Sequence, residues 1–140
     1  MNFHSIDYPY DLRIKKIKFE KEIFSNDKVH VKEYHYRAIN RRKVIGFIIT
    51  HNYLFKKEGC IANLYVEKFY RRNGIGTSLM NMAINDIHEN KIKETSLIAL
   101  PHPDGPSLKE IIKFYESFGF KINQYYEDDY SCCEMIKTDI

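Results

Sequence analysis

A short run of arginines and glycines near the middle of the chain has the residue types that bind phosphate groups. Arg71 and Arg72 precede Gly74 and Gly76, and the run joins an apolar strand pattern to an amphipathic helix pattern. A helix that begins at such a turn has backbone N–H groups without intrahelical acceptors, and the helix dipole adds positive potential there. Glycine lets an anion approach the backbone closely. These residue types therefore predict a pyrophosphate site at this turn.

Two other phosphate-binding loops fit this run less well. A dinucleotide-binding fold has a third glycine where this chain has Leu79. A P-loop ends in Gly-Lys followed by Ser or Thr, and the sequence contains no such run. An ordinary strand-to-helix turn with a solvated arginine pair remains the alternative to a phosphate site.

A second helix is predicted after residue 107, with signals at both ends. Ser107 and Glu110 have the spacing of a capping box, in which the serine accepts from a helical N–H and the glutamate reaches back. Gly119 stands where a left-handed residue ends a helix, and Phe120 opens a new strand pattern. Between these ends the apolar residues recur at helical spacing: Leu108, Ile111, Ile112, Tyr115 and Phe118.

Together these two regions resemble the GNAT superfamily of N-acetyltransferases. Residues 71–76, Arg-x-x-Gly-x-Gly, match that family's (Gln/Arg)-x-x-Gly-x-(Gly/Ala) signature, and residues 114–120 are similar to its F-Y-x-x-x-G-F segment. The resemblance covers about residues 43–137. It implies an α/β (α+β) fold, with a mixed, mostly antiparallel sheet, a central splayed parallel pair and helices on both faces. Residues 1–140 are expected to form one domain of this type.

Hydrophobic periodicity predicts the element order β-β-β-β-α-β-α-β-β. The predicted strands are residues 12–24, 29–39, 44–49, 61–66, 96–100, 121–126 and 131–137, and the predicted helices are 78–90 and 108–118. For the first strand an alternative stays open, because residues 15–21 also fit the start of a helix.

In the family that the chain resembles, the glycine turn holds the pyrophosphate of acetyl-coenzyme A, and the pantetheine arm lies between the splayed strands. The resemblance therefore implies acetyl-CoA as co-substrate, with the arm bound to the main chain of Leu64, Tyr65 and Val66. The family often has Asn and a small residue where this chain has Leu108 and Ile111, so Ser107 is the expected substitute contact. At the turn, the expected cofactor-binding residues are Arg71, Arg72, Asn73, Gly74, Ile75, Gly76 and Thr77.

The resemblance also makes Tyr115 the candidate catalytic residue. It matches the tyrosine of the F-Y pair, and a phenol can protonate a departing thiolate. The alternative is that Tyr115 packs in the core, because it lies on the apolar stripe of its helix. The general base stays open. Some relatives have a carboxylate near the position that Cys60 occupies here. In this chain Glu58 and Glu67 lie close to that position in the sequence, and a chain of water molecules is a further alternative.

The implied activity is acetyl transfer from acetyl-CoA to a primary amine by direct attack on the thioester, with a small-molecule amine favoured. Polyamine acetyltransferases of the family carry an acidic pair where this chain has Ala62 and Asn63, which argues against a polyamine. A protein lysine or N-terminal acetyltransferase and a non-catalytic acyl-CoA-binding module are the alternatives. Candidates for an acceptor pocket, each of which could instead be a core or turn residue, are Tyr65, Tyr125, Tyr126, Tyr130, His102 and the acidic run 127–129.

Composition limits the partners, metal ligands and cellular location that we expect for this protein. The 140 residues include 22 basic and 19 acidic side chains, and the formal charge of +3 is too balanced to indicate a nucleic-acid partner. No apolar run reaches the roughly 18 residues of a membrane span, so we expect no membrane partner. The three cysteines and six histidines show no metal-ligand spacing, and we assign the histidines to structural or surface positions. A sparse, odd cysteine count favours the cytoplasm. A monomer or homodimer is expected.

Overall fold

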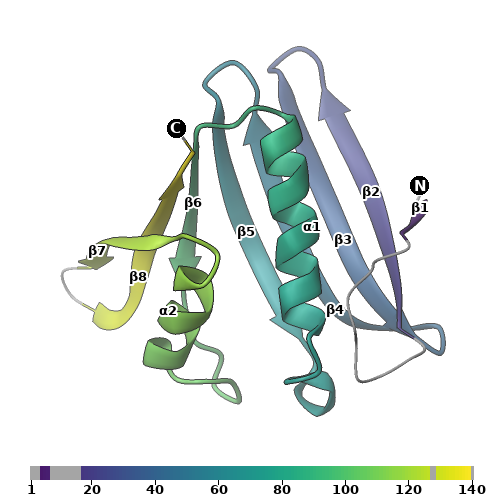
Figure 1. Ribbon diagram of the computed structural model, residues 1–140, viewed down its shortest axis with the longest axis vertical. Coiled ribbons are helices and arrows are strands. Elements are labelled where there is room, and N and C mark those ends of the chain that lie inside the picture. Colours follow the sequence, from purple (N-terminus) through teal and green to yellow (C-terminus); the bar gives the residue numbers. More distant parts are fainter. Residues whose placement is uncertain (1–3, 7–16, 127–128, 140) are drawn as a thin grey trace.

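A computed structural model describes residues 4–6, 17–126 and 129–139, which form one eight-stranded mixed sheet and two α-helices (Figure 1). The elements in chain order are β1 (His4–Ile6), β2 (Lys18–Asn26), β3 (Val31–Asn40), β4 (Lys43–Tyr53), β5 (Glu58–Val66), the 3₁₀ turn η1 (Lys68–Tyr70), α1 (Ile75–Glu89), β6 (Glu94–Ala99), α2 (Leu108–Glu116), β7 (Lys121–Tyr126) and β8 (Asp129–Thr138).

The strand order across the sheet is β1-β2-β3-β4-β5-β6-β8-β7. Among the described strands, β5 and β6 alone pair in parallel, and every other neighbouring pair is antiparallel. The predicted fold class, a mostly antiparallel sheet with a central parallel pair, is confirmed. Short β1 is an addition to the predicted order. The first predicted strand, 12–24, is confirmed only from Lys18 onward, because residues 12–16 lie outside the described part.

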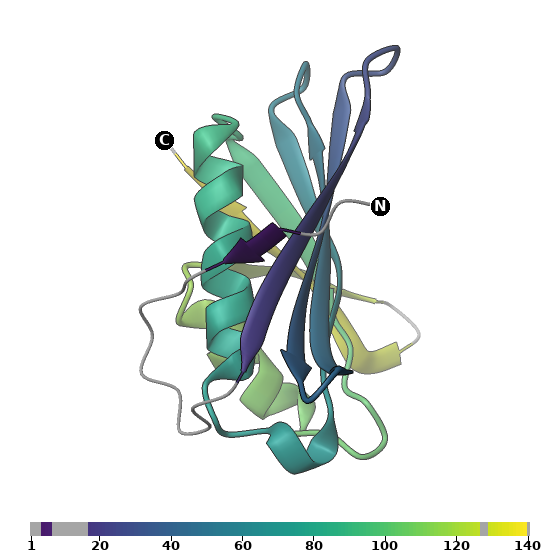
Figure 2. The same cartoon turned by 90° about the vertical axis from the view of Figure 1, so that its right-hand side faces the viewer.

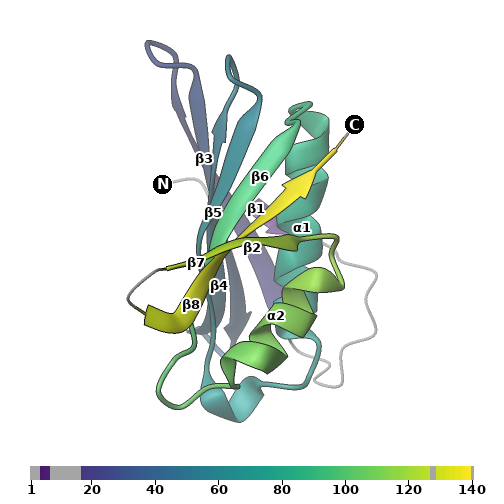
Figure 3. The same cartoon turned by 90° about the vertical axis from the view of Figure 1, so that its left-hand side faces the viewer.

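Both helices pack on one face of the sheet, as the edge-on views show (Figures 2 and 3). The strand register places alternate side chains of β3, β4, β5, β6 and β8 on that helix-covered face. The buried side chains among them pack in the core together with Tyr115 and Phe120. These core residues include Tyr34, Tyr36, Ala38, Ile48, Ile61, Leu97, Ala99, Cys133 and Met135. The expectation of helices on both faces is therefore wrong for the described residues. Helix periodicity shows that a helix is amphipathic, but it does not show on which face of the sheet the helix packs.

The opposite face of the sheet is covered by neither described helix, and we call it the open face. By register, its residues on the central strands include Glu33, His35, Arg37, Phe47, Ile49, His51, Cys60, Asn63, Tyr65, Ser96 and Ile98. The side chain of Ile98 is 44% exposed, and Leu100 just beyond β6 is 62% exposed. Large apolar side chains are therefore left in contact with solvent on this side.

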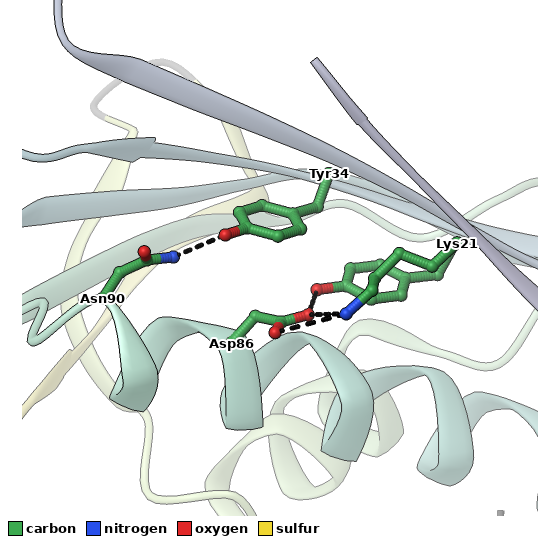
Figure 4. A network of polar contacts seen from close by, with 5 residues as sticks. Lys21, Tyr34, Asp86 and Asn90 are labelled. Carbon is green, nitrogen blue, oxygen red and sulfur yellow. Dashed lines mark hydrogen bonds and ion pairs between the residues drawn. The ribbon is translucent and has the colours of Figure 1, made fainter. Parts of the chain in front are cut away.

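A polar network joins the C-terminal half of α1 to the sheet (Figure 4). The buried carboxylate of Asp86 accepts a hydrogen bond from the Tyr36 hydroxyl and pairs with Lys21 Nζ at 3.3 Å. One turn later, Asn90 Nδ2 donates to the Tyr34 hydroxyl at 2.8 Å. Burial, together with the charge and hydrogen bond of Asp86, raises the pKa of Tyr36. The network therefore fixes the helix over β2 and β3.

The predicted ends of the second helix are confirmed. Ser107 Oγ accepts from the Glu110 N–H at 3.3 Å, and Glu110 Oε1 accepts from the Ser107 N–H at 3.4 Å, which completes the capping box. Gly119 has φ = 96°, a left-handed conformation that glycine adopts without steric penalty. These two signals hold α2 in the register that brings Tyr115 to the core.

Removing the cap should loosen this helix measurably. We expect Ser107→Ala to lower the free energy of unfolding by about 1 kcal/mol, because a helical N–H loses its acceptor. Chemical denaturation monitored by circular dichroism measures the change. Lys109→Ala is the control, since Lys109 is exposed in the first turn of α2 and its side chain takes no part in the capping box. An equal loss in both variants would contradict the assignment of the cap.

Candidate active site

The turn between β5 and α1 presents backbone donors without a cap. Gly74, with φ = 84°, is the N-cap residue of α1, and the first helical bond runs from the Ser78 N–H to the Gly74 carbonyl at 3.0 Å. No side chain caps this end, and the first turn of α1 contains no acidic residue. The N–H groups of residues 75–77 therefore have no intrahelical acceptor, and neither a capping side chain nor a first-turn carboxylate offsets the positive helix end.

Gly76 leaves space beside these donors. A Cβ built at this position would lie 3.6 Å from Phe114 Cζ and 3.8 Å from Val66 Cγ2, which are ordinary van der Waals distances. Packing inside the protein does not require glycine here. The missing side chain leaves room for a ligand against the first turn, and this fits a bound phosphate.

The arginines of the turn occupy different environments. Arg71 Nε donates to the Val66 carbonyl at 2.9 Å, and its Nη1 donates to the Asp104 carbonyl at 2.7 Å. Arg71 therefore joins the end of β5 to the loop after β6, a role that sequence reasoning missed. Arg72 is exposed, with φ = 62°. Asn73 Nδ2 donates to the carbonyls of Tyr70 and Arg71, each at 3.1 Å, and this folds the turn back on itself.

The parallel strands part just before this turn. The β5–β6 ladder runs from the Glu58–Glu94 pair to the Ile61–Leu97 pair and stops, whereas β5 continues to Val66. The two ribbons visibly diverge beyond that point (Figure 1). A register shift between β4 and β5 at Ile49/Thr50 marks the same place. We call this divergence the splay.

The splay places the predicted pantetheine contacts together. Leu64, Tyr65 and Val66 follow the last β6 pair, so no β6 strand occupies that side of their backbone. Leu64 and Val66 pack against the core on the helix-covered face, and Tyr65 lies on the open face. An extended ligand arm could bond to this edge as another strand would.

Tyr115 lies on α2 and is 8% exposed. Its ring packs edge-on against Phe114 and Phe120, at centroid distances of 5.4 and 6.2 Å. Burial raises the pKa of Tyr115 to about 12. The hydroxyl has no hydrogen-bond partner among the described residues, yet it is not among the side-chain polar atoms shut off from solvent. It is therefore a phenol that stays protonated at neutral pH and whose hydroxyl bonds to none of the described residues.

At the start of α2, the hydroxyl that we expected to contact the coenzyme already makes other hydrogen bonds. Ser107 uses its hydroxyl in the capping box, where Oγ also donates to Glu110 Oε1 at 3.1 Å. Leu108 and Ile111 pack against the core. A coenzyme contact by Ser107 stays a prediction, and it would have to share a hydroxyl that already caps the helix.

An aromatic group lines the open face beside the splay. The Tyr65 ring lies 5.3 Å from His102 and 5.9 Å from Phe47, and the Arg71 guanidinium lies 5.9 Å from the Tyr65 centroid. The Gly105 N–H donates to the His102 carbonyl at 2.9 Å, which tightens the loop that carries His102. The structure thus brings Tyr65 and His102 together. Tyr125 and Tyr126 lie on the exposed edge strand β7, and the side chain of Tyr130 and residues 127–128 lie outside the described part.

The carboxylates near β5 do not supply an obvious base. Glu67 pairs with Lys43 at 2.9 Å, and Glu58 is exposed at the far end of the strand. Burial raises the pKa of the Cys60 thiol, although a hydrogen bond with Ser96 acts in the opposite direction. Cys60 is therefore a poor nucleophile.

A histidine–glutamate group on the open face was not predicted. His51 Nε2 lies 2.7 Å from Glu33 Oε1, and His35 Nε2 lies 3.4 Å from the same oxygen. The three side chains come from β3 and β4, which are antiparallel neighbours. From the sequence we assigned each histidine separately to a structural or surface position. Their pairing with Glu33 depends on the register between strands, which no local sequence pattern specifies.

A hollow of about 770 Å³ lies elsewhere, at the end of β2, β3 and β4. Its lining residues are Ile17, Lys18, Glu20, Arg37, Ile39, Asn40, Arg41, Arg42 and Val44. Because β5 and β6 contribute nothing to it, we do not assign it to the splay.

Two structural findings bear on other ligands. Among the described residues, no group of three or more His, Cys, Asp or Glu side chains is placed to hold a metal ion. No helix in the described part combines the length and apolar character needed to cross a membrane.

The chain belongs to the family of GNAT acetyltransferase domains. Residues 31–122, more than half of the chain, match the family described as "Acetyltransferase (GNAT) domain". No curated protein matches the chain. The match includes the splayed strands, the uncapped turn and Tyr115, so the resemblance noted from two short motifs is confirmed.

Solved structures share this fold at low sequence identity. The PaiA N-acetyltransferase from Thermoplasma acidophilum, in complex with coenzyme A, is 23% identical with a TM-score of 0.59, over 76% of this chain and 61% of that one. Ard1 from Thermoplasma volcanium is 24% identical with a TM-score of 0.61, over 76% and 70%. The ribosomal-protein-S18-alanine N-acetyltransferase from Escherichia coli is 21% identical with a TM-score of 0.60, over 74% and 67%. The chain spans 61% of the length of the first.

Proposed function

We propose that this protein is an acetyl-CoA-dependent N-acetyltransferase that acts on a primary amine. One observation carries the proposal: the parallel strands part immediately before a helix whose N-terminus is uncapped and free of acidic residues. The splay offers strand edge to an extended arm, and the turn offers donors to a diphosphate. Membership of the GNAT family supports the same assignment.

Each part of the site has a distinct task in this proposal. The N–H groups of residues 75–77 and the Arg72 guanidinium bind the diphosphate, and the main chain of residues 64–66 orients the arm. Acetyl-CoA, when bound, supplies an activated acetyl thioester. Tyr115, whose pKa burial raises to about 12, is protonated at neutral pH and donates a proton to the departing sulfur. Positioning and proton transfer are thus the main contributions of the protein.

A small-molecule amine is the acceptor that we favour, because Phe47, Tyr65 and His102 form an aromatic wall beside the splay. A protein lysine or N-terminus is the second candidate. It is supported by the absence of a described helix over the open face, together with the exposure of Ile98 and Leu100. A cytoplasmic location and a monomeric or homodimeric state remain part of the proposal.

Coenzyme binding and acetyl transfer test the proposal separately. Isothermal titration calorimetry with coenzyme A and acetyl-CoA measures binding. A thiol-release assay, corrected for thioester hydrolysis, measures transfer to a panel of butylamine, tyramine, a lysine tripeptide and a tripeptide with a free N-terminus. Binding with transfer supports the proposal. Binding without transfer to any member would favour a non-catalytic acyl-CoA-binding module, and no binding would contradict the proposed site.

Arg72→Ala should weaken binding of coenzyme A by about 10-fold, because a hydrogen bond between charged groups contributes roughly 1.5–3 kcal/mol. Calorimetry measures the dissociation constants. Arg42→Ala is a matched control: Arg42 is also exposed with positive φ (67°), but it lies in the β3–β4 turn. Equal affinities for the two variants would remove Arg72 from the coenzyme site.

A further inference from the structure

Glu33 and His51 form a directed pair on the open face. They lie opposite each other on β3 and β4, with His51 Nε2 2.7 Å from Glu33 Oε1. A carboxylate only accepts hydrogen bonds, so Nε2 carries a proton, and whenever the imidazole is neutral its lone pair is on Nδ1. In catalytic triads a carboxylate likewise bonds to one nitrogen of an imidazole and orients the other nitrogen as a base.

Nδ1 of His51 is available to another molecule. It makes no hydrogen bond to a described residue, and it is not among the polar atoms shut off from solvent. The side chain is 29% exposed, so it is packed but reachable. The free lone pair is therefore the accessible basic atom of this pair.

The register places His51 where the parallel strands part. His51 pairs with Cys60, and the next β5 residue, Ile61, makes the last pair with β6. Ala62, the first residue of the splay, is two residues beyond Cys60, or roughly 7 Å along the strand. His51 therefore lies on the strand beside the start of the splay, where a base can act on a reacting group through a water molecule.

The two faces of the sheet have different access to the splay. On the helix-covered face, Leu64, Val66, Phe114 and Tyr115 are packed in or against the core. The open face has no described helix over it. An amine that reaches the splay therefore enters from the face on which His51 lies, opposite the face of Tyr115.

We infer that His51 is the general base that deprotonates the acceptor amine, directly or through one water, and that Glu33 is its positioning residue. This inference rests on the proposed acetyl transfer and names the base that the sequence left open. It assigns the two proton transfers to opposite faces, with His51 receiving a proton on the open face and Tyr115 giving one on the helix-covered face.

An N–H bond of the ammonium form of the acceptor breaks, and an N–H bond forms at Nδ1 of His51. The neutral amine then forms a C–N bond to the acetyl carbon as the C–S bond breaks, and nitrogen gives up a second proton to solvent. Sulfur takes a proton from Tyr115, which regains one from solvent. His51 releases its proton to water, so one proton is released per acetyl group transferred.

Several charged groups face His51 and set its surroundings. Glu33 and His35 face it from β3, Glu22 lies further along the same face on β2, and Cys60 flanks it on β5. Burial acts to raise the pKa of Glu33, but the hydrogen bonds with His51 and His35, together with the charge that either imidazole carries when it is protonated, outweigh burial and lower that pKa. Glu33 therefore stays anionic at neutral pH and can hold the Nε2–H tautomer.

Loss of the base should be visible in the pH profile. With the best acceptor of the panel, we expect His51→Gln to lower kcat/KM by about 100-fold at pH 7 and by less than about 10-fold at pH 9.5, where more of the amine is already neutral. The dissociation constant for coenzyme A should be unchanged. His88→Gln is the matched control, because His88 also pairs with a carboxylate, Asp139, at 3.2 Å, but it lies near the C-terminal end of α1. A loss of equal size at all pH values would overturn the assignment, because a merely structural role lowers the whole profile.

A readout without catalysis tests the geometry. Nitrogen-15 NMR of the imidazole side chains in the free protein should show neutral His51 as the Nε2–H tautomer. Glu33→Ala should give a tautomer mixture, and Glu33→Gln, which keeps an acceptor oxygen, should restore part of the preference. An Nδ1–H tautomer in the wild type would overturn the inference, whatever the activity.

The outcomes separate this inference from the proposed function. An active wild-type protein whose pH profile is unchanged in His51→Gln would overturn the inference and leave the acetyltransferase proposal standing. A wild-type protein that transfers acetyl to no panel member would overturn both. An active wild-type protein with the Nε2–H tautomer and the pH-dependent loss would support both.

Discussion

Tyr115→Phe should lower kcat by roughly 100- to 1,000-fold, the range expected when a general acid is removed. The substitution removes only the hydroxyl oxygen and keeps the ring that packs against Phe114 and Phe120. Because that hydroxyl has no hydrogen-bond partner among the described residues, the folded state should lose little stability. Steady-state kinetics measures kcat, and calorimetry should give an unchanged dissociation constant for acetyl-CoA.

Tyr34→Phe is the matched control for this variant. Tyr34 is also buried, but its hydroxyl accepts a hydrogen bond from Asn90, the C-cap residue of α1. Its loss should lower the free energy of unfolding by about 1 kcal/mol and leave kcat unchanged. The two variants therefore separate a catalytic hydroxyl from a structural one. Unchanged turnover in Tyr115→Phe would leave Tyr115 with core packing alone.

Tyr115 also predicts behaviour in alkaline solution. Its pKa in the folded protein is about 12, above the ordinary value of 10.0, because burial disfavours the phenolate. The folded state therefore keeps the proton at pH values where the unfolded chain begins to lose it, and its contribution to stability falls as pH rises from about 10 to 12. Below that range the phenol is protonated, so it can serve as a donor throughout a neutral or mildly basic assay.

The parts of the site that follow from local chain chemistry were predicted from the sequence. The capping box of Ser107 and Glu110, the left-handed Gly119 and the glycine turn at Gly74 each depend on residues within a few positions of one another. Turn and cap geometries restrict residue type strongly, because they require a specific φ or a specific acceptor. Local signals were therefore enough to predict α2 and the turn before α1, although α1 begins at Ile75 and the predicted helix began at residue 78.

Other parts depend on contacts between distant segments and could not be predicted in this way. Arg71 bonds to the carbonyl of Asp104, 33 residues away, and Glu33 meets His51 only because β3 and β4 pair in one particular register. The side of the sheet on which α2 packs likewise depends on contacts between distant segments. A change of register by one residue moves every side chain of a strand to the other face, so these contacts follow from the assembled sheet.

The register also explains how the site is divided. Leu64 and Val66 pack under the helices while Tyr65 between them lies on the open face, because alternate residues of a strand point to opposite sides. One five-residue stretch beyond the last β6 pair thus serves both faces. Coenzyme binding and acceptor binding can therefore be altered separately by substitutions on the same strand.

Asp86→Ala should be the most destabilising of the substitutions considered, lowering the free energy of unfolding by about 3 kcal/mol. The change removes the acceptor of the buried Tyr36 hydroxyl and the partner of Lys21 (Figure 4). Lys21 is 26% exposed in its side chain and can turn toward water, so the largest part of the loss comes from the hydroxyl left without a partner. Urea denaturation measures the change.

Two further variants separate these contributions. Asp86→Asn keeps an acceptor oxygen for Tyr36 and removes the charge, so it should cost about 1 kcal/mol. Glu89→Ala, on an exposed position of the same helix, should change stability by less than about 0.5 kcal/mol. The network lies in the C-terminal half of α1, away from the uncapped N-terminus, so folded Asp86→Asn should bind coenzyme A with wild-type affinity. If Asp86→Ala unfolds no more easily than Glu89→Ala, the network does not hold the helix to the sheet.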